Sequence, residues 1–369
     1  MKHYPLLVVM MAIPIAAKAE MPLYRATQFT LPWATTVYDA NGHGEIVFEQ
    51  ELDGMRRSFV RRLDGTTTML PLFPGGGTAT GVAINDSGTI AVTVRLVGDA
   101  SRVYTWSETT GYIQMPEQPG PIDSNQGPTD ITNNNVVSWV TPGFLGAGNA
   151  RGLWNAQTNE VTYLPDIAGG HTVIRDLSEG GYAVGDSSWS RFGAVFHPDG
   201  TGFQLRSSPT YFSSFSMNGG NARVSNDGTV VSRASVSVGG VPTSASYIWD
   251  RNGRIIEERI NPGFAYTGIS GDGLIAGAIQ TANGVSPFLY EIGGTQILME
   301  SRTIERNFSG ELFGLPIEVL DNQAVLLYQS GGQVGVPLTY VFLEPVPEPG
   351  TLIALGAGLA ALLRRKRTT

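Results

Sequence analysis

The chain of 369 residues has no cysteine and only four histidines, and both shortages limit its chemistry. Without cysteine it forms no disulfide and no thiolate metal site, so its stability must come from packing and hydrogen bonding. His43, His171 and His197 fall in unrelated sequence contexts, and neither H-E-x-x-H nor G-x-S-x-G occurs. We therefore expect a protein that is not an enzyme, with scattered carboxylates leaving a polysaccharide hydrolase or lyase as the alternative.

A long amphipathic helical pattern is also missing from the middle of the chain, whereas glycine (47 residues) and proline (22 residues) are abundant. Many turns and short apolar runs favour an all-β domain. No linker or change in composition interrupts the body, so one large domain accounts for it better than two.

A unit of strand, polar turn and strand recurs through this body. Its copies are anchored on the last apolar residue before each turn, at Tyr38, Ile84, Ile131, Leu177, Val224, Ile269 and Leu320, with spacings of 46, 47, 46, 47, 45 and 51 residues. The turns are rich in Asn, Asp and Gly, which suit tight hairpins, and β-branched residues follow them. A second hairpin follows in each copy, so about 46 residues hold four strands, the size of a propeller blade. The pattern predicts a seven-bladed β-propeller over residues 20–345.

The start of the mature chain has the pattern of a last strand. Thr30-Leu31-Pro32 matches the strand ends Met69-Leu70-Pro71, Gln114-Met115-Pro116 and Tyr163-Leu164-Pro165. The seventh copy supplies only three strands, so we predict that the N-terminal strand completes the last blade and removes the open sheet edges. An unattached N-terminal arm is the alternative.

The loops between and within blades are expected on one face of the disc and the Asn/Asp/Gly turns on the other. Aromatic residues gather in the loops and form a candidate ligand face: Phe144, Trp189, Tyr211, Phe212 and Phe264. Such side chains either stack on sugar rings or bind a protein partner, or else they pack between blades. On the turns, Asp86, Asp227 and Asp272 offer oxygen ligands for Ca²⁺, but turn formation explains the same residues without an ion. No cofactor is predicted.

The N-terminus has the organisation of a secretory signal peptide over residues 1–19. Lys2 precedes an apolar run from Leu6 to Ala17, and small residues at Ala17 and Ala19 predict cleavage after Ala19. The run is short for a membrane span, so an uncleaved anchor is the weaker interpretation.

All 32 acidic residues lie beyond the signal peptide, and six of the 24 lysines and arginines lie in the two ends of the chain. So acidic a body would repel the phosphates of a nucleic acid.

The last residues, 346–369, combine three features in order. Pro347-Glu348-Pro349 is followed by an apolar run from Gly350 to Leu363 and then by the basic residues Arg364, Arg365, Lys366 and Arg367. As a helix this run spans about 21 Å, less than the roughly 30 Å of a bilayer core. The bases are expected to stay cytoplasmic, which leaves the propeller outside the membrane. A permanent tail anchor is the alternative.

This tail resembles the PEP-CTERM sorting signal of Gram-negative bacteria. The resemblance implies transient anchoring in the inner membrane by a C-terminal hydrophobic helix and cleavage near Pro347-Glu348-Pro349 by an exosortase-type protease. It also implies export to the cell surface or extracellular matrix, commonly alongside exopolysaccharide production. The repeats are similar to those of HAF-type proteins of bacterial exteriors, which supports a propeller and transfers no site.

The sequence therefore predicts an exported, non-enzymatic surface or matrix protein associated with exopolysaccharide or envelope proteins. A carbohydrate-binding or carbohydrate-active propeller and a protein-interaction platform are the alternatives.

Overall fold

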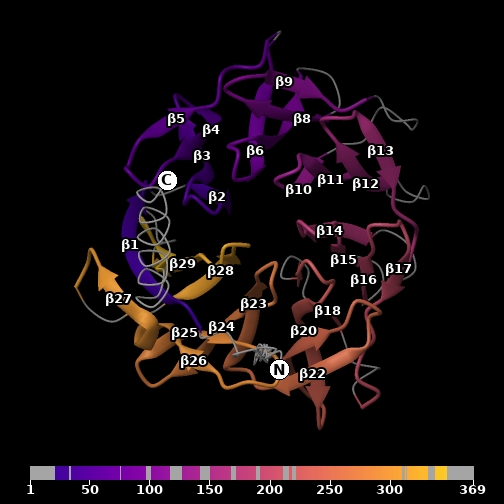
Figure 1. The fold of residues 1–369 in the computed structure, drawn as a ribbon, viewed down its shortest axis with the longest axis vertical. Helices are drawn as coiled ribbons and strands as arrows, with labels where there is room; N and C mark the ends of the chain where they lie inside the picture. Colours follow the sequence, from indigo (N-terminus) through magenta and orange to yellow (C-terminus); the bar gives the residue numbers. More distant parts are fainter. Residues whose placement is uncertain are drawn as a thin grey trace, which may run out of the picture.

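The computed structural model describes residues 21–32, 35–74, 76–96, 101–116, 127–141, 150–167, 172–187, 192–210, 216–217, 222–309, 312, 314–330 and 337–346. Within these ranges the chain forms strands and turns, with one short 3₁₀ helix, Met299–Arg302, and no α-helix. Seven sheets are arranged around a central axis (Figure 1). The predicted seven-bladed β-propeller is confirmed. The expected signal and C-terminal helices lie outside the described residues.

Blades 1 to 6 are antiparallel sheets whose strands run from the axis to the rim in chain order. Blade 1 contains β2 (Thr36–Ala40), β3 (Ile46–Leu52), β4 (Met55–Arg61) and β5 (Thr67–Met69). Blade 2 contains β6 (Thr78–Ile84), β7 (Ile90–Arg95), β8 (Ser101–Ser107) and β9 (Gly111–Gln114). Blade 3 contains β10 (Gly127–Ile131), β11 (Val136–Thr141), β12 (Ala150–Asn155) and β13 (Glu160–Tyr163). Blade 4 contains β14 (Thr172–Leu177), β15 (Ala183–Ser187), β16 (Gly193–Phe196) and β17 (Gly202–Gln204).

The last three blades follow the same plan with two additions. Blade 5 contains β18 (Ser216–Met217) and β19 (Arg223–Val224), which both pair with β20 (Val230–Val238), then β21 (Val241–Trp249) and β22 (Ile255–Ile260). Blade 6 contains β23 (Phe264–Ile269), β24 (Ile275–Thr281), β25 (Gly284–Tyr290) and β26 (Ile297–Leu298). Blade 7 contains β28 (Leu315–Val319), β29 (Val325–Ser330), β30 (Leu338–Val346), β1 (Leu23–Leu31) and an outer strand, β27 (Thr303–Arg306).

The first strand of the chain closes the ring, as predicted. β1 pairs antiparallel with β30 over nine residues, from Leu23↔Val346 to Leu31↔Leu338. The hydroxyl of Tyr24 donates to the carbonyl of Gln323 at 3.0 Å, which ties β1 to the innermost turn of the blade. β27 then adds to β1 in parallel, an extra strand that the repeat pattern did not predict.

A β-bulge near the end of most innermost strands sets the register of the repeat, and it corrects two predicted anchors. In blade 2 the pairing shifts between Gly81 and Ala83, and equivalent shifts occur in blades 1, 3, 4, 6 and 7. After it, the first turn residue donates its N–H to a carbonyl four residues on, as Asn85 does to Thr89. The matching donors in blades 1 and 7 are Asn41 and Leu320, so the anchors there are Ala40 and Val319, not Tyr38 and Leu320. Bulges cause such shifts because they insert one residue opposite an unbroken partner strand.

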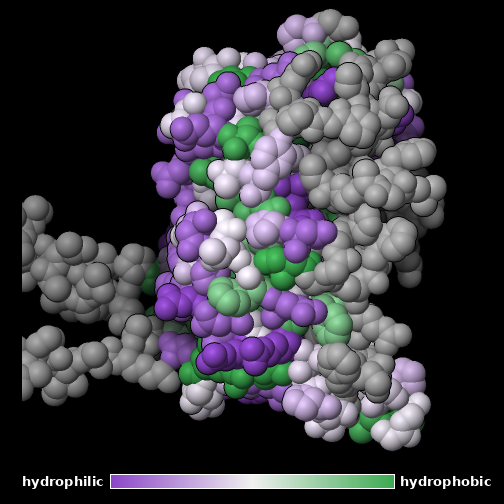
Figure 2. All heavy atoms as spheres, turned by 90° about the vertical axis from the view of Figure 1, so that its right-hand side faces the viewer, coloured by the Kyte–Doolittle hydropathy of each residue, from purple (hydrophilic) through white to green (hydrophobic). Residues whose placement is uncertain are grey.

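Among the described residues, the hydrophobic core lies between the blades as seven clusters, one in each gap. Between blades 1 and 2, for example, Val47 and Val60 pack against Ile90 and Trp106. Burying apolar surface at about 25 cal/mol per Å² in every gap holds the blades together without disulfides. Seen edge-on, the described part of the rim mixes hydrophilic and hydrophobic side chains (Figure 2).

The two faces of the disc differ in the connections they carry. We call the side with the innermost turns, such as Asn85–Thr89, the turn face, and the side where the innermost strands begin the loop face. Because successive strands are antiparallel, β30 runs toward the turn face and β1 starts there. No helix among the described residues is long and apolar enough to cross a membrane.

Candidate functional site

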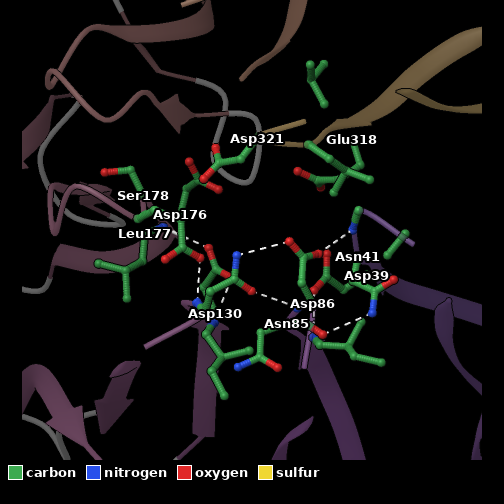
Figure 3. Close-up of a pocket in the computed structure, with 18 of the residues that line it drawn as sticks. Asp39, Asn41, Asn85, Asp86, Asp130, Asp176, Leu177, Ser178, Glu318 and Asp321 are labelled. Carbon is green, nitrogen blue, oxygen red and sulfur yellow. Dashed lines mark hydrogen bonds between the residues drawn. The ribbon is translucent and has the colours of Figure 1, made fainter. Parts of the chain in front are cut away.

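Five charged side chains from five blades meet at the axis of the propeller. They occupy one repeat position, two residues before the turn, where each pairs with a residue near the start of the next strand, as Asp39 does with Val47. The five residues, which we call the axial cluster, are Asp39, Asp130, Asp176, Arg223 and Glu318. Figure 3 shows the four carboxyl groups of the cluster. Blades 2 and 6 carry the small residues Ala83 and Gly268 at this position.

Three axial carboxylates connect their own blade to the next one. Oδ2 of Asp39 accepts the backbone N–H of Ile84 at 2.8 Å. Asp130 accepts the N–H of Leu177 at 2.8 Å, and Asp176 accepts that of Val224 at 2.6 Å. These N–H groups belong to innermost strands, which pair with one neighbour only, so the carboxylates satisfy donors that would otherwise be unpaired.

Arg223 is the only base in the axial cluster, and it reaches two blades. Its Nε lies 3.8 Å from Oδ1 of Asp176 in blade 4, and its Nη2 lies 3.6 Å from Oε2 of Glu318 in blade 7. All three side chains are mostly buried, with 15 to 20% of their surface exposed. One guanidinium therefore faces four carboxyl groups.

Burial and the excess of carboxyl groups over the single guanidinium shift the pKa values in the cluster. Burial, partly countered by hydrogen bonds from the backbone, raises the pKa of Asp39 to about 7. Burial also raises the pKa of Glu318 to about 8, although Arg223 opposes the shift. The pKa of Asp130 is well above its usual range because of burial and the charge of Asp176, to which it is hydrogen bonded. Burial by itself lowers the pKa of Arg223, but the surrounding carboxylates raise it overall. Protons are therefore held in the cluster near neutral pH.

Cavities lie on both sides of the axial cluster. On the loop face a cavity of about 420 Å³ is lined by Tyr38, Thr129 and Arg175 together with all five cluster residues. A second cavity, of about 470 Å³, lies between blades 7 and 1 and shares Tyr38, Asp39, Arg223 and Glu318 with the first. The space on the turn face is smaller, about 90 Å³. A ligand of the size of a sugar residue would therefore reach the cluster from the loop face.

The turns form a second ring around the axis on the turn face, which we call the turn ring. In most blades a backbone N–H of the turn donates to the turn of the following blade, as Gly42 does to Oδ1 of Asp86 at 2.7 Å. The further links are Asp86 to Asn133, Asn133 to Glu179, Gly180 to Asn226, Asn226 to Gly271, Gly271 to Asp321, and the amide of Asn322 to Gly42. The last link closes the circle between blades 7 and 1.

The three aspartates considered for Ca²⁺ take part in hydrogen bonds of the turns. Oδ1 of Asp227 accepts from the hydroxyl of Ser225 and from the N–H of Thr229. Asp272 accepts from the hydroxyl of Ser270 in the same manner. Among the described residues, no three His, Asp or Glu side chains are grouped as ligands of one metal ion.

Of the five aromatic residues predicted to form a ligand face, the structure describes only Phe264. Phe264 is 3% exposed, stacks on Phe288 with ring centroids 4.9 Å apart and lies under the guanidinium of Arg259. It is not an exposed aromatic, because the connection between blades 5 and 6 is short and Phe264 already belongs to strand β23. Phe144, Trp189, Tyr211 and Phe212 lie outside the described residues, as do Ala17 and Ala19 of the signal and Pro347, Glu348, Pro349, Arg364, Arg365, Lys366 and Arg367 of the tail.

Comparison with known protein families concerns the segment that continues from β30. Residues 345–367 match the PEP-CTERM protein-sorting motif. The match implies an exported, cell-surface protein that is sorted by an exosortase. The PEP-CTERM motif begins within β30, so that its first two residues, Pro345 and Val346, are the last two of that strand. A search of curated proteins gave no match.

Solved structures similar to this chain share little sequence with it. A streptogramin B lyase has a TM-score of 0.51 and 13% identity, covering 87% of this chain and 98% of its own. An oligogalacturonate lyase in complex with manganese has a TM-score of 0.49 and 15% identity, covering 89% and 99%. TolB from Acinetobacter baumannii has a TM-score of 0.40 and 15% identity over 62% of this chain, which spans about half (54%) of TolB. At these identities the likeness shows the fold alone.

The axial cluster was not found from the sequence, although a signal for it exists. Aligned on the corrected anchors, a charged residue directly precedes the anchor in five of seven copies. The misplaced anchors in blades 1 and 7 hid two of these five, Asp39 and Glu318.

Proposed function

We propose that the protein is a non-enzymatic component of the cell surface or extracellular matrix that associates with exopolysaccharide. The PEP-CTERM match supports export and sorting. The observation that carries the non-enzymatic assignment is the use of the axial carboxylates: those of Asp39, Asp130 and Asp176 accept backbone N–H groups of the next blade. Because these side chains already bind backbone groups of the next blade, we assign them a structural role. A rigid scaffold suits a matrix protein.

The loop face is the binding surface in this proposal. Its cavity of about 420 Å³ offers hydroxyl groups of Tyr38 and Thr129 and the guanidinium of Arg175, which is paired with Asp186 at 2.5 Å. Tyrosine presents an apolar ring with a polar tip, a combination that suits sugars. The strongly acidic body favours a neutral polysaccharide over an anionic one.

The test is a binding measurement on the tail-processed protein with exopolysaccharide from the producing cell and with a neutral and an anionic reference polysaccharide. We expect the Tyr38→Ala variant to bind about tenfold more weakly, which corresponds to about 1.4 kcal/mol. The matched control is Tyr163→Ala, since Tyr163 is exposed on the rim strand β13 and does not line the cavity. Equal affinity of both variants would place the binding surface elsewhere.

A carbohydrate-active enzyme is the second candidate, and one observation favours it. Asp130 and Asp176 share a hydrogen bond beside the loop-face cavity, and the raised pKa of Asp130 would let its carboxyl act as a general acid. Product analysis on the same samples separates the candidates. New reducing or unsaturated ends that vanish in Asp130→Asn would establish an enzyme and end the non-enzymatic proposal.

A protein-interaction platform is the remaining alternative. Failure to bind any polysaccharide, together with specific recovery of envelope proteins on the immobilised propeller, would support it.

A further inference from the structure

The PEP-CTERM segment begins inside the folded propeller and not after a linker. The match starts at residue 345, whereas β30 continues to Val346 and pairs there with Leu23. Only Pro347, Glu348 and Pro349 separate Val346 from the apolar run that starts at Gly350. Three extended residues span at most about 11 Å.

The direction of β30 decides which side of the disc the tail leaves from. β30 runs toward the turn face, so Val346 and its partner Leu23 lie together at that face. A membrane-bound precursor tethered by so few residues therefore has its turn face toward the membrane. The loop face, with the larger cavities, points outward.

This arrangement creates a conflict for the processing protease. Peptide-binding clefts commonly take substrates as extended chains that pair with the cleft through their backbone. The residues just before Pro347-Glu348-Pro349 are already paired: Glu344, Pro345 and Val346 lie opposite Arg25, Tyr24 and Leu23. The last residue of β30 that also pairs with β29 is Leu343, opposite Val325, so the three final residues pair with β1 alone.

The weakly held side of this end is β30 and not β1, because Tyr24 is fully buried and β1 also pairs with β27, whereas Glu344 is exposed and Val346 only partly buried. Pro345 has no N–H to donate to the ladder, and proline is rare within paired strands for that reason. The Arg25–Glu344 ion pair across it is 3.6 Å long and about half exposed, so it contributes little. Further along, buried residues such as Ala26 and Leu343 hold the two strands together.

We propose that this end, the terminal clamp formed by Leu23–Arg25 and Glu344–Val346, is the docking point of the membrane protease that processes the tail, and that the clamp must open for cleavage. The inference rests on the proposed sorting function. It identifies the part of the propeller that the protease contacts and the strand pairing that must separate before cleavage.

The absence of native cysteine allows a direct test with engineered disulfides in the full-length protein, expressed in a bacterium that has an exosortase. Arg25→Cys with Glu344→Cys joins two directly opposite, exposed residues of the clamp. Thr30→Cys with Thr339→Cys joins β1 and β30 at the far end and is the matched control. Opposite residues in an antiparallel pair lie about 4.5–5.5 Å apart, within the range that a disulfide bridges.

The readout is the rate at which precursor becomes tail-processed protein, with disulfide formation measured by thiol alkylation. We expect the clamp disulfide to slow processing at least tenfold, reductant to restore it, and the far-end disulfide to leave it unchanged. Equal processing of both oxidised variants would overturn the docking proposal alone. If the cysteine-free parent is not processed either, the sorting function falls with it.

Discussion

At the scale of single residues, the axis of this propeller depends on Arg223. Four buried carboxyl groups surround it, and it forms ion pairs with Asp176 and Glu318. Removing one partner of a buried charge network leaves the others uncompensated, which costs far more than the network contributes as a whole. The arginine is thus the residue that permits carboxylates to act as connectors between blades.

Substituting Arg223 by leucine should lower the free energy of unfolding by about 3 kcal/mol at pH 8. The loss should be much smaller at pH 5, where the carboxyl groups hold protons. Urea unfolding at the two pH values measures both effects. Arg56→Leu is the control, because Arg56 is 76% exposed beside Glu49 and should change stability little at either pH. Equal losses at both pH values for Arg223→Leu would contradict this role.

The raised carboxyl pKa values also predict the pH dependence of the unaltered protein. The pKa of Glu318 is about 8 and that of Asp39 about 7 when folded, above the ordinary range near 4 of the unfolded chain. The folded state therefore binds more protons, so this stabilisation is complete below about pH 4 and is lost as the pH rises through about 7 to 8. Calorimetry should therefore show the melting temperature falling by several degrees between about pH 4 and about pH 8. In Glu318→Gln the fall should be smaller, and an unchanged slope would count against the assignment.

At the scale of elements, the turn ring needs close approach between neighbouring turns. A Cβ on Gly180 would lie 2.3 Å from the carbonyl oxygen of Asn226, and one on Gly271 would lie 2.2 Å from the carboxylate of Asp321. Both distances are too short for real contacts, so the glycines are required by packing and not by an unusual φ.

Gly180→Ala should therefore destabilise the propeller by about 1–3 kcal/mol, the usual cost of overpacking. Gly127→Ala is the matched control, because its new Cβ would meet Oγ1 of Thr93 at an ordinary 3.5 Å. Thermal unfolding of both variants measures the difference. Similar melting temperatures would show that the turns can separate without cost.

Sequence reasoning succeeded for elements whose signal is local. Asn-, Asp- and Gly-rich turns followed by runs such as Ile90-Ala91-Val92 are sufficient to place hairpins, and their even spacing predicts the blades. It failed for the axial cluster, because a bulge next to the turn shifts the register and the charges meet only when the blades close into a circle. The parallel strand β27 was missed for a similar reason, since its partner β1 lies almost 280 residues away.

At the scale of the whole molecule, closure is supplied by β1. Its pairing with β30 joins the two ends of the described chain, and buried side chains such as Tyr24 and Ala26 enter the core between blades 6 and 7. Without β1, the long strand β30 would become an edge with unpaired backbone groups.

Deleting residues 20–31 should therefore give a protein that associates or unfolds, with loss of the monomer peak in size-exclusion chromatography. A synthetic peptide with the sequence of Leu23–Leu31 should restore the monomer by strand addition. A scrambled peptide of the same composition should not. A monomeric, cooperatively folding deletion variant would show that six complete blades and a three-stranded seventh suffice.

The bond between Tyr24 and Gln323 bridges 299 positions of the chain. Folding rates fall as contacting residues lie further apart along the polymer, because ordering so long a loop costs entropy before any contact rewards it. During synthesis and export, the strand made first must wait unpaired for the strand made last. Closure of the ring therefore comes last. Until β1 pairs with β30, the molecule is an open arc of blades with an exposed strand edge.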